Sequence, residues 1–455
     1  MAAGTFLGCA HHASAGAGAA ALCGTGLVLL RRPTARAVGL GALALGLGWL
    51  SAGFRCETAS MLTDIAERAP LCDFSGHILE DASGLGTLAK LARINCHGYK
   101  QVLNPGVAML DGASGAAGSS ISGHGWLLPL GNDGFGHARA RAGAHAALDP
   151  SEIELTAPSS GPQGVAAGAR RNLELVTRPL GDIRAALLRG LVVGDTKSLD
   201  PAVLESFRRA GLSHLLAVSG SNVAIVLGAV ALALRRLGLL VRVLTGAGAL
   251  GLYLLVVGPE PSVLRASLMG AIALAALAAG ARTEPLAALG VAVTILICLR
   301  PPLVYSVGLH LSVAATAGIV LWGNALVVLL KPLPRLLTLP LGTSLAAQAA
   351  VAPLLIATFG ELSLVAPAAN LLAAPAVAPA TVLGLAAGLA HGFHPVAGAL
   401  LARLAEPWAA WILWVGESFG APSWAAVTLP MEVGWLAAAC VSAGVWTTVK
   451  VTSPQ

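Results

Sequence analysis

The most informative polar residues of this chain lie in the segment GLVVGDTKSLDPAVLESFRRAGLSHLLAVSGSNVAIV, residues 190–226. A charged stretch there runs directly into an apolar one, which contains His214, Ser219, Ser221 and Asn222. Inside a bilayer each unpaired polar group costs several kcal/mol, so such a cluster persists only where protein or water surrounds it. The segment therefore predicts a cavity or a path through a membrane.

The spacing within this segment suggests how the polar side chains are presented. His214 and Asn222 fall at helical spacing, so they can share one face of a helix. The SGSN run at residues 219–222 weakens that helix, because glycine and small polar side chains compete with its backbone bonds. A helix broken at membrane depth exposes backbone groups to a passing solute. The alternative is a polar patch that bonds neighbouring helices.

A second candidate is VVGPEPSVLRASLMGA, residues 256–271. Gly258 and the prolines beside it indicate a tight loop, and Ser262, Arg265 and Ala266 share a face in the first turns of the following span. An arginine placed there could bind a phosphate through bidentate bonds or pair with a buried acid. The alternative is an arginine that snorkels or caps the helix.

Two further segments carry polar residues at membrane depth. In LHLSVAATAGIV, residues 309–320, the side chains of His310, Ser312 and Thr316 favour helix packing through Ser and Thr. Residues 346–379 combine Gln348 and Asn370 with four prolines, Pro353, Pro367, Pro375 and Pro379. Proline breaks helices, so this stretch predicts two interrupted helices that face each other along a path. Gln348 or Asn370 could equally bond neighbouring helices.

No catalytic set is visible. GDTKSLD, residues 194–200, lacks the G-x-x-x-x-G-K-[ST] pattern and a preceding strand, so it is no phosphate loop. A triad of Ser219, His214 and Asp195 has no nucleophile elbow to support it. No H-x-H-x-D-H or C-x-x-C spacing occurs, so we expect no enzymatic activity, no metal centre and no cofactor.

Composition identifies the class of protein. The 455 residues are 56% hydrophobic and 11% charged, with a mean hydropathy of +0.77, whereas soluble domains carry roughly 25% charged residues. This is an integral membrane protein. Abundant Gly and Ala allow close helix packing or reflect a GC-rich genome. The net charge of +6 is weak evidence for a nucleic-acid partner.

Apolar segments define the expected spans. A span needs about 20 apolar residues, and the Pro-rich segments are expected to be broken or re-entrant. The segments lie near residues 16–30, 37–54, 211–234, 240–257, 262–280, 284–299, 303–325, 341–359, 363–391, 404–420 and 433–449. If the arginines after the first segment are cytoplasmic, the later Arg and Lys clusters are cytoplasmic too, and only Arg300 disagrees. The C-terminus is then cytoplasmic.

The polar region between the second and third spans is expected to form a small β-domain outside the cytoplasm. Residues 72–80, 89–96 and 125–131 are short, bounded by Gly, Ser or Asp, and typical of strands. The tract GASGAAGSSISG, residues 112–123, is expected to be a flexible loop. Cys56, Cys72 and Cys96 lie in this region, and either one disulfide forms among them or their thiols stay unpaired.

The polar segments resemble the membrane domain of the ComEC competence-protein family, the inner-membrane channel for single-stranded DNA in natural transformation. The resemblance covers residues 181–390. It rests on five blocks in the family's order: Gly194, Asp195 and Leu199; Gly211–Val223; Gly258–Ala266; Leu311–Gly318; and Phe359, Gly360, Asn370, Leu371 and Pro375. The insert sits where many members carry an OB-like domain. Its few aromatic residues favour single-strand binding only weakly.

Two features depart from the family. Asn222 stands where a His is common, so no proton or metal role is carried over to it. Many members also continue into a metallo-β-lactamase-like domain, whereas this chain stops at Gln455. We therefore expect the nuclease and the motor to be separate polypeptides, together with a separate DNA-binding receptor.

The sequence as a whole predicts a polytopic α-helical membrane protein of about 9–11 spans with a small extracytoplasmic, OB-like β-rich insert. The expected parts are an N-terminal hairpin at 1–55, the β-domain at 56–180, a channel domain at 181–400 and C-terminal helices at 401–455. Site residues expected along the path are His214, Ser219, Asn222, Ser262, Arg265, His310, Gln348 and Asn370, with Gly194, Asp195, Gly220, Gly258 and Pro375 as structural positions.

The expected function is transport of single-stranded DNA across the cytoplasmic membrane. The protein is expected to contact membrane lipid, and a homo-oligomer is compatible with this function. A small-solute permease that uses the same broken helices is the leading alternative. A non-transporting remnant or scaffold is the third.

Overall fold

A computed structural model describes most of the chain. The described residues are 62–68, 70–83, 86–97, 99, 101–111, 117–131, 136, 139, 144–216, 218–300, 303–304 and 306–430. The expected N-terminal hairpin, the last expected span and Cys56 lie outside them. The chain falls into two compact units, one with residues up to Gly168 and Gly290–Ser306, the other with Ala169–Leu289 and residues from Val307 onward.

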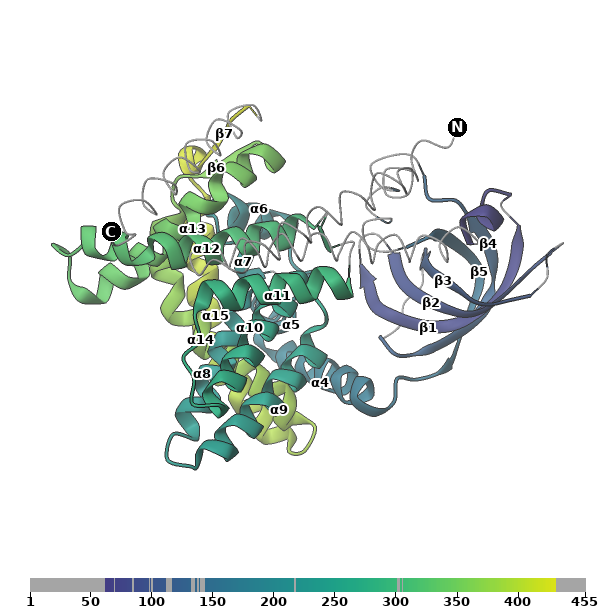
Figure 1. Ribbon diagram of the computed structural model, residues 1–455, viewed down its shortest axis with the longest axis horizontal. Coiled ribbons are helices and arrows are strands. Elements are labelled where there is room, and N and C mark those ends of the chain that lie inside the picture. The colour runs from purple at the N-terminus through teal and green to yellow at the C-terminus, as the bar shows by residue number, and fades with distance from the viewer. Residues whose placement is uncertain are drawn as a thin grey trace, which may run out of the picture. The chain divides into compact units, whose positions relative to one another are not determined.

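Five strands of the first unit close into a barrel (Figure 1). The strands are β1 Leu71–Ser83, β2 Gly86–Cys96, β3 Val102–Leu110, β4 Ser120–Leu128 and β5 Ala146–Ala157. Their order around the barrel is β1-β2-β3-β5-β4, with β3 and β5 parallel and the other pairs antiparallel. Apolar side chains such as Leu91, Ile94 and Leu148 fill the interior. Closure removes the unpaired strand edges that an open sheet would leave.

A disulfide joins the first two strands of the barrel. Cys72 and Cys96 are direct partners in the β1–β2 register, and their sulfurs are bonded. Both side chains are buried in the barrel core. Of the two interpretations of these cysteines, the structure therefore supports the disulfide.

The strands predicted from the sequence coincide with β1, β2 and the end of β4, whereas β3 and β5 were not predicted. The Gly-Ser tract was expected to be a loop, but residues 120–123 belong to β4. The glycines of this strand have a packing role, because a Cβ on Gly123 or Gly125 would collide with the backbone of β5. Glycine inside a strand often marks such a close backbone approach.

The rest of the described chain is almost wholly helical. The helices are α4 Gly161–Thr177, α5 Asp182–Val193, α6 Pro201–Arg209, α7 Ser213–Leu216, α8 Gly220–Ala233, α9 Leu239–Val257, α10 Pro261–Ala278, α11 Pro285–Leu299, α12 Val307–Leu329, α13 Arg335–Phe359, α14 Ala366–His391 and α15 Pro395–Gly420. A short sheet pairs β6 Glu361–Ser363 with β7 Ala426–Thr428.

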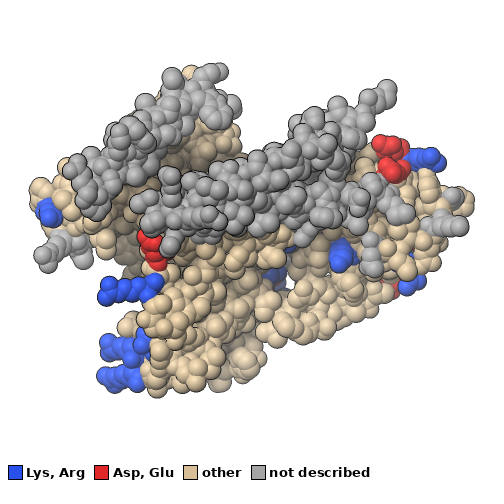
Figure 2. All heavy atoms as spheres, in the orientation of Figure 1, with Lys and Arg blue, Asp and Glu red and all other residues tan. Residues whose placement is uncertain are grey.

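Six of these helices, α9, α10, α12, α13, α14 and α15, are long and apolar enough to cross a membrane. The apolar helices α8 and α11 are shorter. Figure 2 shows that uncharged residues cover most of the described surface on one face, with charged side chains in a few places. The protein is therefore a multi-pass membrane protein, as the composition predicted.

The largest apolar core of the helical unit forms where α5 and α6 pack against α14 and α15. Phe207 of α6 is 0% exposed, and its ring lies against Gly416 of α15, where a Cβ would collide with it. A Cβ on Gly384 of α14 would lie 2.6 Å from Val192 of α5. Small residues thus let these helices approach closely, as is common in membrane bundles.

The expectation of interrupted Pro-rich helices is wrong. Pro340 and Pro353 lie inside the continuous helix α13, and Pro375 and Pro379 lie inside the continuous helix α14. A bundle tolerates internal proline, because neighbouring helices and local adjustments satisfy the freed backbone groups. The chain is instead interrupted between α7 and α8, directly before the place that the SGSN run predicted: Ser219 precedes α8, whereas Gly220, Ser221 and Asn222 form its first turn.

Candidate functional site

The interruption between α7 and α8 is held by the loop that follows α5. Gly194 ends α5 in a left-handed conformation, with φ 76°, and its N–H donates to the carbonyl of Gly190 at 2.9 Å. A Cβ at Gly194 would lie 2.9 Å from a methyl group of Val218. Glycine therefore meets two requirements there, a positive φ and close contact with the interrupted backbone.

Polar side chains gather at the start of α8. Ser219 is the N-cap residue, with φ −98° and ψ 157°, yet no side chain caps the helix. Its hydroxyl lies 2.5 Å from that of Ser221 and donates to Oδ1 of Asn222 at 3.4 Å. Asn222 is 1% exposed and donates from Nδ2 to the carbonyl of Leu191 in α5 at 3.0 Å. These side chains thus bond to one another and to α5, and leave the first turn of α8 without a side-chain cap.

The beginning of α10 lies against this turn. Ser262 donates to the carbonyl of Val218 at 2.7 Å and so satisfies one backbone group of the interruption. A Cβ on Gly220 would collide with Nη2 of Arg265 and would lie 3.1 Å from the Cβ of Ala266. The shared face of Ser262, Arg265 and Ala266 predicted from the sequence is therefore present, and it contacts the start of α8.

Arg265 is the charged centre of this cluster. The residue is 6% exposed. Nε donates to the hydroxyl of Ser312 at 3.0 Å, and Nη1 donates to the hydroxyl of Thr316 at 2.6 Å and to the sulfur of Met269 at 3.4 Å. All of these partners are neutral, and within the described residues no carboxylate pairs with Arg265. The sequence interpretation with a buried acid partner is therefore wrong for the described part of the chain.

Three residues of this region had a different role in the sequence analysis, or none. Ser312 and Thr316 were interpreted as helix-packing residues, but their hydroxyls hold the guanidinium of Arg265. Tyr253 of α9 was not singled out, although it is 1% exposed and its hydroxyl lies near Asn222. The one-turn spacing of Ser312 and Thr316 was a usable signal for an arginine clamp.

The other expected path residues are not part of this cluster. His214 lies exposed on α7, and because the helix ends at Leu216 it cannot share one helical face with Asn222. His310 is exposed on α12, and Asn370 is half-buried on α14. Gln348 donates to the carbonyl of Ser363 in β6 at 2.8 Å, so it bonds neighbouring elements.

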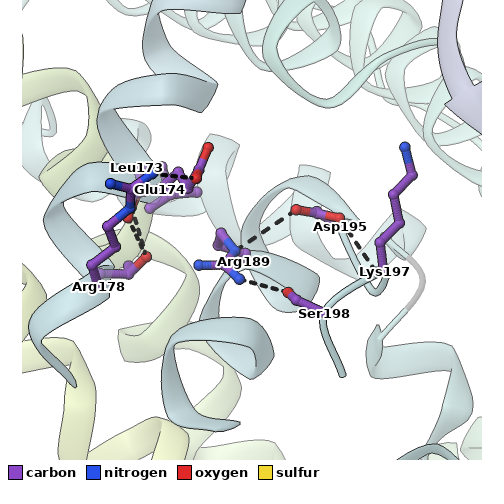
Figure 3. A network of polar contacts seen from close by, with 8 residues as sticks. Leu173, Glu174, Arg178, Arg189, Asp195, Lys197 and Ser198 are labelled. Atoms are coloured by element: carbon purple, nitrogen blue, oxygen red, sulfur yellow. Dashed lines mark hydrogen bonds and ion pairs between the residues drawn. The ribbon is translucent and has the colours of Figure 1, made fainter. Parts of the chain in front are cut away.

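The GDTKSLD loop, residues 194–200, has a structural network of its own (Figure 3). Arg189 of α5 lies between Asp195, at 3.7 Å, and Ser198, at 2.5 Å, and Lys197 points away from them. The backbone N–H of Lys197 donates to the carboxylate of Asp195 at 3.3 Å. These contacts fix the loop that carries Gly194.

A second polar cluster ties α6 to the β6–β7 sheet. Arg208 pairs with both Glu205 and Glu361. The hydrogen bond from Arg208 holds the pKa of the Glu205 carboxyl below its usual range, with the positive charge of Arg209 adding to the effect. The hydroxyl of Ser363 donates to the carbonyl of Arg209 at 2.7 Å. These contacts anchor the end of α6 just before the interrupted segment.

No group of three or more metal-ligating side chains occurs among the described residues. The candidate site is therefore the interruption itself: a polar helix start, uncapped by any side chain, with one buried arginine against it. It can bind or guide a negatively charged solute, because both the helix start and the guanidinium carry positive potential.

Comparison with known proteins identifies the family. Residues 191–453 match the family model described as Competence protein. ComE operon protein 3 of Bacillus subtilis (strain 168) is 28% identical over 209 residues, which make up 45% of this chain and 26% of that protein. The match thus spans about a quarter of that relative's length. No solved structure matches the chain. The family model covers more than half of the chain, which therefore belongs to the competence protein family.

Proposed function

We propose that this protein carries single-stranded DNA across the cytoplasmic membrane during natural transformation. The observation that carries the proposal is the interrupted segment between α7 and α8 in a multi-pass bundle, with the buried Arg265 beside it, which pairs with no carboxylate among the described residues. A strand of DNA presents one negative charge per nucleotide, and a pathway for it needs positive potential within an otherwise apolar bundle. Membership of the competence family supports the same conclusion.

The barrel is proposed to be an OB-like domain on the outer side of the membrane. Its closed five-stranded order, β1-β2-β3-β5-β4, is compatible with that fold. The Cys72–Cys96 disulfide favours an oxidising compartment. The distribution of Arg and Lys between the expected spans favours the same orientation, with a cytoplasmic C-terminus.

The barrel's charge distribution bears on how it would meet DNA. Lys90 and Arg93 lie exposed on β2, whereas His124 of β4 lies between two exposed carboxylates, Asp73 on β1 and Glu152 on β5. Acidic residues repel a phosphate backbone. We therefore expect any incoming strand to meet the β2 side of the barrel. A separate receptor, nuclease and motor would act together with this chain.

Transformation frequency tests the proposal. In a competent host, a clean deletion is complemented with wild type, Asn222→Ala, Arg265→Ala or the surface control Arg403→Ala, and membrane levels of each protein are measured by immunoblot. We expect the deletion to abolish transformation while DNA still binds the cell surface, and Arg265→Ala to restore far fewer transformants than the control.

Two outcomes would contradict this proposal. Unchanged transformation in the deletion strain would remove the DNA role. Saturable uptake of a small solute that depends on the same residues, without a transformation defect, would favour the permease.

A further inference from the structure

We propose that Arg265 and the first turn of α8 form a binding site for a single phosphodiester group. The site consists of Nη2 of Arg265 and the backbone N–H groups at Gly220 and Ser221; it is called the Arg265 site below. The inference rests on the proposed function for one point only, namely that the phosphodiester belongs to DNA.

The first argument is the uncompensated charge. Arg265 is 6% exposed, and its neighbours Ser312, Thr316 and Met269 supply dipoles but no negative charge. A buried cation without a counter-ion is strongly destabilising in a protein interior and within a bilayer. A bundle that keeps such a buried cation gains stability when an anion binds to it.

The second argument is the helix start. α8 has 14 residues, and no side chain caps its first turn, although its N-cap residue Ser219 is of a preferred capping type. The hydroxyl of Ser219 is instead bonded to Ser221 and Asn222. The positive end of α8 thus lies against a positive guanidinium, an arrangement that is unfavourable until an anion neutralises both.

The third argument is the orientation of the guanidinium. Ser312 and Thr316 occupy Nε and Nη1, which fixes the plane of the group. Nη2 of Arg265 lies against Gly220. The space that a Cβ on this residue would fill is occupied by Nη2. Ser221 in the same turn is exposed, so a ligand can reach this side. Ser312 and Thr316 are therefore positioning residues for Arg265.

Another arginine of the helical unit shows the contrast. Arg170 of α4 donates from Nε to the carbonyl of Val256 at 2.6 Å and from Nη2 to that of Leu255 at 3.3 Å. These carbonyls end α9, where the helix dipole is negative and favours a cation. Arg170 is thus electrostatically satisfied by a helix C-terminus, whereas Arg265 lies at a helix N-terminus.

The ligand class follows from the donors. One guanidinium nitrogen, Nη2, and two backbone N–H groups suit a singly charged group with several acceptor oxygens. A phosphodiester has one negative charge and two unesterified oxygens, so one oxygen can accept from Nη2 while the other accepts from the helix start. Nucleic acid and phospholipid headgroups share this chemistry. We assign the site to DNA because, under the proposed function, the phosphodiester groups of a transported strand pass this site one after another.

The test uses the full chain in maltoside detergent free of phospholipid, with wild type, Arg265→Gln, Arg265→Lys and Arg403→Gln. Arg403 is exposed on α15 and serves as the matched control. The first readout is the melting temperature with increasing dimethyl phosphate. The second is the affinity for a fluorescent single-stranded oligonucleotide as a function of salt, with phosphatidylglycerol as a competitor.

We expect dimethyl phosphate to stabilise wild type and Arg403→Gln but not Arg265→Gln, with a partial response in Arg265→Lys. Without ligand, Arg265→Gln should melt no lower than wild type, because the neutral side chain removes an uncompensated charge. The slope of log affinity against log salt should fall by about 0.7 in Arg265→Gln, as expected for one lost phosphate contact on a single strand.

The outcomes separate this inference from the proposed function. Equal stabilisation of wild type and Arg265→Gln by dimethyl phosphate, or an unchanged salt slope, overturns the site while DNA binding by wild type still supports the function. A dimethyl phosphate response that requires Arg265, without any binding of the oligonucleotide, supports the site and overturns the DNA function. If phosphatidylglycerol displaces the oligonucleotide from the Arg265 site, the assignment to DNA is overturned in favour of lipid headgroups.

Discussion

Removal of the Cys72–Cys96 disulfide is expected to destabilise the barrel by an amount that depends on the length of the loop that the bridge closes. The bridge closes a loop with a sequence separation of 24 residues. The chain-entropy relation for a loop of this length predicts a stabilisation of about 3.5 kcal/mol at 25 °C, or several hundred-fold in the folding equilibrium. The bridge joins register partners inside the core, so Cys72→Ala/Cys96→Ala should also lose packing there.

Hydrogen exchange of the full chain in lipid nanodiscs measures this effect. Peptides from β1 and β2 should lose protection by roughly two orders of magnitude or more in the double variant. Cys298→Ala, a cysteine on α11 outside this bridge, should leave the same peptides unchanged. Protection within twofold of wild type in the double variant would refute the reasoning. Alkylation of both Cys72 and Cys96 in protein taken from intact cells would also refute it, because bonded sulfurs do not react with an alkylating reagent.

Three further predictions concern single residues. Burial lowers the pKa of His145 below its ordinary value of about 6.5, and Nδ1 of this residue accepts a hydrogen bond from the N–H of Val107 at 3.3 Å. As the pH falls, the imidazole is therefore protonated in the unfolded chain before it is protonated in the folded barrel. The stability of the barrel should fall as the pH drops below about 6.5. Hydrogen exchange corrected for intrinsic rates should show this fall in wild type but not in His145→Gln, and equal pH profiles would contradict it. Phe207→Ala should lower stability by about 3 kcal/mol through the cavity left in the helical core, seen as a lower melting temperature; a retained melting temperature would show that the core is not packed around this ring. Gly194→Val should cost about 1–3 kcal/mol from its positive φ and its contact with Val218, and an unchanged melting temperature would argue against that close approach.

Much of the architecture could be predicted from the sequence because hydropathy reports directly on membrane spans. The segments near 240–257, 262–280 and 363–391 became α9, α10 and α14 with almost the predicted bounds. The role of α5 could not be predicted in this way. Its residues are few and flanked by charges, yet Ala186, Leu187 and Leu188 are fully buried between other helices. Such burial depends on tertiary neighbours that a local pattern does not contain.

The same limit applies to the candidate site. The SGSN run predicted an interruption close to the observed one, because weak helix formers and competing hydroxyls act locally, although Gly220, Ser221 and Asn222 themselves are helical. The prolines predicted interruptions that did not form, because neighbouring helices in a bundle can satisfy the backbone groups that proline frees. The clamp of Ser312 and Thr316 on Arg265 joins side chains 47 and 51 residues apart in the sequence. Only the packing of α10 against α12 brings them together.

Site-specific crosslinking during DNA uptake tests the central claim most directly. A photoreactive amino acid is placed at Ser221, exposed in the first turn of α8, or at Leu400, which is 60% exposed on α15. Competent cells then take up labelled DNA under illumination. We expect labelled single strands to crosslink to position 221 and not to position 400. Uptake that proceeds without any crosslink at position 221, or with equal crosslinking at both positions, would contradict a DNA path along the interrupted segment.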